Sequence, residues 1–159
     1  MTQKLTGGRG KIGALALSGG SIRILRFPVS TSTNGVERST GFALLSGTVV
    51  RRAYVAVKTL EATASTKTIS VGLLSSETGG ATNGFLNAVS TASAQIVAGN
   101  PAFTGTSVQF GSLLAVNAAS AQLIRDHVVI SGNAKTVTYT LNSAHTELVA
   151  DVVLEVYEL

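Results

Sequence analysis

The chain of 159 residues contains no cysteine and no tryptophan, and only two prolines and one methionine. Without cysteine, no disulfide can hold the fold, and no thiolate can act as a nucleophile or a metal ligand. No apolar run approaches the ~18 residues that a membrane-spanning helix requires. The apolar stretch at residues 12–17 is shorter than the roughly 7–15 residues of a signal-peptide core and contains Gly13. We therefore expect neither a cleaved signal peptide nor a membrane partner.

Charged side chains are also scarce, at 13% of the chain, about half of the ~25% that is usual for globular proteins. Hydroxyl side chains replace them, with 17 Ser and 19 Thr. The charge is unevenly spread, because residues 1–60 hold nine Lys or Arg and one acid, whereas residues 61–159 hold three Lys or Arg and seven acids. Two interpretations remain open: basic and acidic strands pair within one fold, or a basic arm meets an acidic patch between subunits.

The residues that are abundant favour β-structure, because Thr, Val and Ile carry a branched Cβ that packs well on a pleated surface. In residues 48–60, Ala53, Val55 and Val57 alternate with polar or small side chains, which indicates a strand with one buried face. Long amphipathic helices are absent, and the spacing of Phe85, Leu86 and Val89 predicts one short helix over residues 85–94. Strands are predicted at residues 22–27, 42–45, 48–60, 67–74, 95–98, 108–115, 127–130, 135–141 and 149–159.

This pattern of short strands and turn signals predicts an all-β fold, an antiparallel β-sandwich of jelly-roll type with two four-stranded sheets. Turn residues predict polar loops at residues 30–39 and 75–84, and a hairpin over residues 127–141. Glycines at positions 7, 8, 10, 13, 19 and 20 predict that residues 1–20 form an extended, flexible N-terminal arm. Residues 21–159 would then form the sandwich domain.

No motif in the sequence defines a catalytic, metal or cofactor site. Residues 8–13 fit the pattern G-x-G-x-x-G, but the preceding strand and following helix that a dinucleotide site needs are missing. Asp126 or Asp151 could pair with His127 or His145, yet no nucleophile elbow is present. Two histidines without cysteine make a weak metal site.

Other classes of ligand are disfavoured by composition and position. The acids Glu37, Glu61 and Glu77 lie in or beside predicted turns, and nothing singles out a pair for glycoside cleavage. Aromatic residues make up 5% of the chain, which is too few for the base-stacking platforms that bind single-stranded nucleic acid. We expect no cofactor and no nucleic-acid partner.

Several segments, in their style and order, resemble small structural proteins of tailed bacteriophages. They are residues 53–59, 67–77, 83–86, 136–141 and 152–157. The resemblance covers roughly residues 40–159 and implies a non-enzymatic virion protein, namely a capsid decoration (cement) protein that binds the outer surface of the major capsid protein shell and stabilises it. It further implies a homo-oligomer, with a trimer favoured, that is made in the host cytoplasm and located on the capsid surface. It carries no residue-level motif, so no functional residue is transferred.

The predicted arm supplies the candidate partner contacts. Lys4, Arg9 and Lys11 would meet acidic groups of the shell or of a neighbouring subunit as the arm orders on binding. Alternative functions are a phage tail or head-fibre component, and a carbohydrate-binding β-sandwich module. An enzyme is the least supported class.

Overall fold

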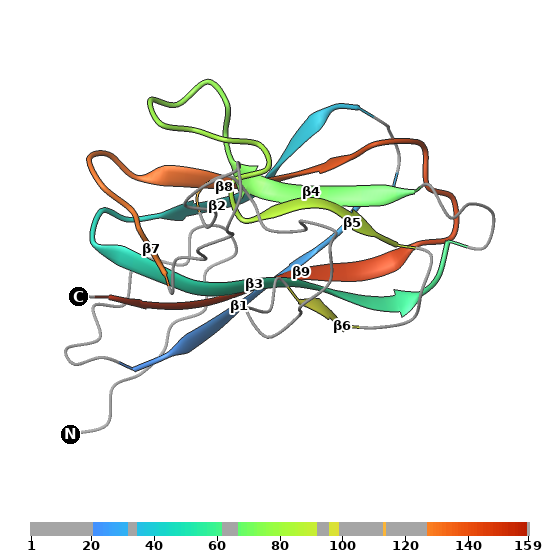
Figure 1. Ribbon diagram of the computed structural model, residues 1–159, viewed down its shortest axis with the longest axis horizontal. Coiled ribbons are helices and arrows are strands. Elements are labelled where there is room, and N and C mark those ends of the chain that lie inside the picture. The colour runs from blue at the N-terminus through green and yellow to red at the C-terminus, as the bar shows by residue number, and fades with distance from the viewer. Residues whose placement is uncertain are drawn as a thin grey trace, which may run out of the picture.

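The computed structural model describes an all-β protein in which two antiparallel sheets pack against each other (Figure 1). The described residues are 21–31, 35–61, 67–91, 96–98, 113 and 127–158. Within them the strands are β1 (Arg23–Pro28), β2 (Glu37–Leu44), β3 (Thr48–Thr59), β4 (Thr68–Leu73), β5 (Leu86–Ser90), β6 (Ile96–Ala98), β7 (Val128–Val129), β8 (Lys135–Leu141) and β9 (Val149–Glu158). The predicted β-sandwich is confirmed. Its jelly-roll form stays a prediction. The alternation of β1 to β4 between the two sheets is consistent with it.

The two sheets differ in size. Sheet A has the order β1-β9-β3-β6, with β7 also paired to β3, and sheet B has the order β2-β8-β4-β5. The longest strand pairing is that of β3 with β9, which runs from Thr48 opposite Glu158 to Thr59 opposite Val149. A β-bulge between Val50 and Arg52 turns both Arg51 and Arg52 to the exposed side.

The hydrophobic core lies between the sheets and follows the alternation seen in the sequence. On β3, Ala53 and Val55 are buried, and on β8, Val137 and Leu141 are buried. Because successive strand residues point to opposite faces, one face of each strand enters the core. The same cluster includes Ile69, Val71, Leu73, Phe85, Leu86, Val89, Val152, Leu154 and Val156.

The predicted short helix at residues 85–94 is wrong, because residues 86–90 form β5 and pair with β4. Ala88 adopts a left-handed backbone conformation, with φ of 50°, and the pairing shifts register between Ile69 and Val71. This irregularity places Leu86 and Val89 on the same buried side, although they are three residues apart. The spacing of these apolar residues therefore resembles that of a helix, but the pairing with β4 makes the segment a strand.

The predicted hairpin over residues 127–141 is also wrong. β7 pairs with β3 in sheet A, whereas β8 lies in sheet B. The backbone of Ile130 donates to Thr48 O and accepts from Gly47 N, which fixes this segment to the start of β3. The turn residues 131–134 do connect two strands, but the chain changes sheet there. The predicted loop at residues 30–39 ends early as well, because Glu37 already begins β2.

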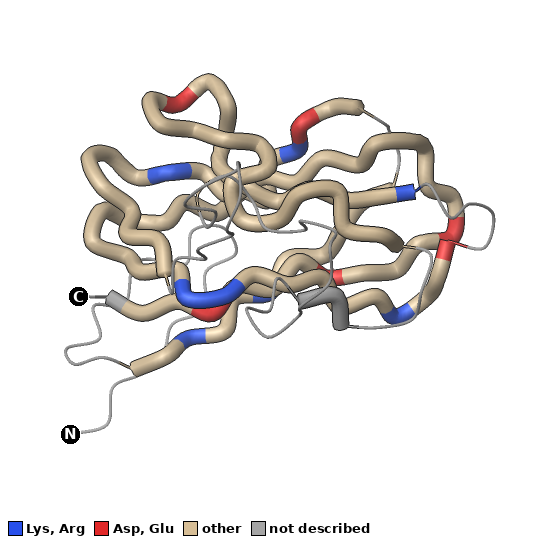
Figure 2. The backbone as a smooth tube through the Cα atoms, viewed as in Figure 1, with Lys and Arg blue, Asp and Glu red and all other residues tan. Residues whose placement is uncertain are grey.

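Charge pairing follows the first of the two interpretations left open by the sequence. The acidic strand β9 lies between the basic strands β1 and β3. Asp151 lies 3.7 Å from Arg26 and 2.7 Å from Lys58, and Glu155 lies 3.8 Å from Arg52. Figure 2 shows how few charged positions the backbone carries. The second interpretation concerns residues 1–20, which are not among the described residues.

Candidate functional site

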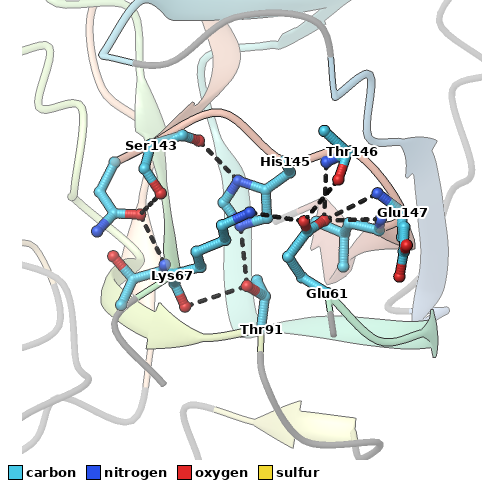
Figure 3. Close-up of polar contacts among 10 residues, drawn as sticks. Glu61, Lys67, Thr91, Ser143, His145, Thr146 and Glu147 are labelled. Carbon is cyan, nitrogen blue, oxygen red and sulfur yellow. Dashed lines mark hydrogen bonds and ion pairs between the residues drawn. The ribbon is translucent and has the colours of Figure 1, made fainter. Parts of the chain in front are cut away.

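The most connected polar group in the described part of the chain is the carboxylate of Glu61, just after β3 (Figure 3). Glu61 is only 2% exposed. Its Oε1 accepts from Lys67 Nζ at 2.6 Å and from Thr146 Oγ1 at 3.0 Å. Its Oε2 accepts from the backbone N–H groups of Thr146, Glu147 and Leu148 at 2.9 to 3.0 Å. The carboxylate therefore has five donors.

These donors determine its ionisation. Burial by itself would raise the pKa of Glu61, but the Lys67 ammonium and the N–H and O–H groups of residues 146 and 147 more than offset this and hold the pKa well below its usual range. Lys67 immediately precedes β4, and Leu148 immediately precedes β9. One ionised side chain thus joins the end of β3 to the starts of one strand in each sheet.

A second buried pair, Thr91 and His145, lies beside this carboxylate (Figure 3). His145 Nδ1 is 2.7 Å from the carbonyl oxygen of Ser143, and since a carbonyl only accepts, Nδ1 carries a proton. His145 Nε2 is 2.9 Å from Thr91 Oγ1. The Thr91 hydroxyl also lies 3.0 Å from Lys67 O, so the pair is fixed to the same segment as the ion pair.

The arrangement of Thr91, His145 and Ser143 O has the order of a nucleophile, a base and a group that orients the base. Such a site also needs room for the reacting atom next to the nucleophile. Thr91 is 0% exposed and His145 is 3% exposed. A substrate cannot reach this hydroxyl, so the pair cross-links segments of the fold. Among the described residues, no group of three or more His, Cys, Asp or Glu is placed to hold a metal ion.

The other two acids named from the sequence have a similar structural role at the loop of residues 74–84. Glu37 accepts from Ser75 N at 3.0 Å, from Ser75 Oγ at 2.6 Å and from Thr138 Oγ1 at 2.9 Å. Glu77 accepts from Thr136 N at 2.9 Å and Thr136 Oγ1 at 2.7 Å. Both carboxylates hold the loop against β8, and neither forms a pair with the other acids named from the sequence.

The candidate catalytic residues that the structure describes, Asp151, His127 and His145, are not brought together by the fold. Asp151 is engaged by Arg26 and Lys58, and His127 is exposed next to β7. Within the described part of the chain, no hydrogen bond or ion pair links Asp151 to either histidine. Asp126 and the candidate contact residues Lys4, Arg9 and Lys11 are not among the described residues.

Two surface features were not predicted. The first is the edge strand β1 of sheet A, on which Ile24 is 58% exposed, together with Ile22 just before the strand, which is 50% exposed. The second is a pocket beside Lys135, a residue that is only 8% exposed. Position 135 shares the two-residue period of Val137, Tyr139 and Leu141. This alternation is the sequence signal that could have predicted an inward-facing side chain for Lys135.

No family model, curated protein or solved structure matches this chain. No helix among the described residues is long and apolar enough to cross a membrane. The surfaces of the fold and the resemblance of the sequence to phage structural proteins are therefore the basis for a proposed function.

Proposed function

We propose that this protein is a non-enzymatic virion structural protein, a capsid decoration (cement) protein that binds the outer surface of the major capsid protein shell and stabilises it. The resemblance to small phage structural proteins supplies the partner. The observation that carries the binding function is the edge strand β1, where Ile24 and, just before the strand, Ile22 are exposed.

An exposed apolar edge strand is a natural site of association. Its outer backbone N–H and C=O groups are available for pairing with another chain, and natural proteins usually protect such edges with charge or by covering them. Here Ile24 lies in one row with Glu155 and Arg52, so the apolar side chain adjoins an ion pair. An apolar centre with a polar border is the usual composition of a protein interface.

The interior of the fold suits a protein that must keep its shape on a shell. Glu61, Glu37 and Glu77 connect loops to strands through many hydrogen bonds, in a chain that has no cysteine to form a disulfide. A rigid surface loses little conformational entropy on binding, so more of the contact energy remains as affinity. Residues 1–20, with Lys4, Arg9 and Lys11, would add a second contact with acidic groups of the shell or of a neighbouring subunit.

The test is co-sedimentation with empty shells assembled from the major capsid protein of the same genome. The variant Ile22→Asp/Ile24→Asp should bind at least about tenfold more weakly, because two charges would replace buried apolar contacts. Deletion of residues 2–20 should lower shell occupancy further. Light scattering of the free protein would test the proposed trimer.

Val149→Asp is the matched control, since Val149 is also 50% exposed on sheet A. It lies opposite Thr59, six residues along β9 from the partner of Ile24, which is about 20 Å in a strand. We expect this variant to bind as the wild type does. Wild-type protein that does not sediment with the shells would refute the proposed function, and equal binding by the double variant would remove β1 from it.

The carbohydrate-binding alternative is weakened by the positions of the tyrosines. Tyr139 is buried, and its hydroxyl accepts from Ser30 N at 2.9 Å. Tyr54 and Tyr157 are half-buried on sheet A, whereas sugar platforms need exposed rings. Binding to a glycan array would reverse this preference.

A further inference from the structure

A pocket of about 110 Å³ opens at one end of the sandwich, between the loop of residues 74–84 and the segment around β7. Among the described residues that line it, most are apolar, and Thr78, Ser131 and Lys135 are polar. The apolar lining residues are Leu73, Leu113, Val128, Val129 and Ile130. A pocket with an apolar wall and a few convergent polar groups is the usual form of a small-molecule site.

Lys135 is the unusual member of this wall. It is 8% exposed and occupies a core-facing position of β8, in phase with Val137. Buried lysines are rare unless they are paired with an acid. Within the described part of the chain, no carboxylate lies within ion-pair distance of Lys135 Nζ. The ammonium donates a hydrogen bond to the carbonyl oxygen of Thr78.

The position of that bond places the charge at the pocket. Thr78 and Lys135 both line it, so the hydrogen bond between them lies along its wall. An ammonium has three donors, and the Thr78 carbonyl uses one of them. The remaining donors and the positive charge are complementary to an anion, and a charge-assisted hydrogen bond to a carboxylate is among the strongest polar contacts available.

The acid next to Thr78 in the sequence is engaged by other donors. Glu77 belongs to the same loop as Thr78, but its two oxygens accept from Thr136 N and Thr136 Oγ1. The Glu77 carboxylate is thus engaged by Thr136 and forms no ion pair with Lys135. Among the described residues, the Lys135 ammonium in the pocket wall therefore has no counter-charge.

We propose that this pocket binds a short aliphatic carboxylate, with the carboxylate on Lys135 and the carbon chain against Leu73, Val128 and Ile130. The volume fits a group of side-chain size, because an apolar cavity of about 150 Å³ accommodates benzene. The carboxylate can belong to a free small acid or to the C-terminal residue of a polypeptide. The proposal does not depend on binding to a capsid shell.

The probe is butyrate, followed by the amide signals of Thr78, Gly79 and Ser131 in NMR spectra of the full chain. We expect saturable shifts at these amides, with a dissociation constant in the millimolar range for so small a ligand. Butyramide, which has the same shape and no charge, should bind at least about tenfold more weakly. Equal shifts with butyramide would overturn the proposal. An absence of shifts with butyrate would also overturn it if the peptide acid of the second arm does not bind either.

The second arm uses acetyl-Ala-Leu with a free or an amidated C-terminus. Binding of the free acid but not of butyrate assigns the site to a polypeptide terminus, and binding of butyrate assigns it to a free acid. If neither acid binds, the site does not exist.

The variant Lys135→Met keeps the length of the side chain and removes its charge. It should lower affinity for the bound acid at least about tenfold, as the loss of a charge-assisted hydrogen bond requires. Lys58→Met is the matched control, because Lys58 is an exposed lysine on sheet A. The affinity of this control variant for the acid should equal that of the wild type. Unchanged affinity in Lys135→Met would refute the role of the ammonium. If this variant does not fold, the comparison of butyrate with butyramide on the wild type still decides the question.

Discussion

Replacing Glu61 by glutamine should cost far more stability than any substitution of a surface acid. Glutamine can direct its oxygen toward the N–H groups of Thr146, Glu147 and Leu148, but its NH₂ group then faces the Lys67 ammonium, which is itself a donor. Two donors then face each other, and the Lys67 ammonium, whose side chain is 14% exposed, loses its charged partner. Breaking one side of a buried ion pair costs about 3–5 kcal/mol. We expect a loss in this range for Glu61→Gln.

The assay is urea denaturation of the wild type, Glu61→Gln and the control Glu155→Gln. Glu155 also forms an ion pair, but its partner Arg52 is 3.8 Å away and half exposed, so the control should lose at most about 1 kcal/mol. The denaturant slope should stay constant, so that the midpoints report stability. A loss below about 1 kcal/mol in Glu61→Gln would refute the assignment of Glu61 as a main anchor of the fold.

The same carboxylate predicts the direction of the pH dependence. Because the folded-state pKa of Glu61 is lowered, its contribution is complete above the unfolded-state pKa of about 4.3 and is lost as the pH falls below that value toward the folded-state pKa. Glu61 alone should therefore contribute up to about 1.4 kcal/mol per pH unit to the decline of the unfolding free energy below pH ~4. Glu61→Gln should show a correspondingly shallower acid profile, and an unchanged profile would contradict the pKa direction.

Two further substitutions test packing and a long-range hydrogen bond. Gly72→Ala should destabilise the fold by about 3 kcal/mol or more, because the added Cβ would stand 1.9 Å from the carbonyl oxygen of Ala81; thermal unfolding measures this, and a near-normal midpoint would show that the loop yields easily. Tyr139→Phe should lose about 1 kcal/mol, because the Tyr139 hydroxyl accepts from Ser30 N across 109 positions of sequence. Hydrogen exchange at Ser30 should become faster in that variant, and unchanged exchange would contradict the bond.

The sequence by itself determined the fold class. Period-two alternation in residues 48–60 and 135–141 identified β3 and β8 and the faces that they bury, because side chains alternate strictly along a strand. Turn residues located the long loop of residues 75–84. These signals are local, and each can be read from a short window of the chain.

The tertiary structure decided which segments pair and which polar groups meet. The apolar spacing of residues 85–89 suits a helix, and only the pairing with β4 makes them a strand. The turn residues 131–134 do not reveal whether the following strand joins the same sheet or the other one, because both sheets contain the same residue types. Glu61 meets Lys67 and the segment 146–148 because three strand ends converge, a contact that joins positions 85 to 87 apart. Lys135 is buried for a similar reason. The sequence shows its alternation with the apolar residues of β8, but only the packing of the two sheets places it in a pocket whose described lining residues include no acid.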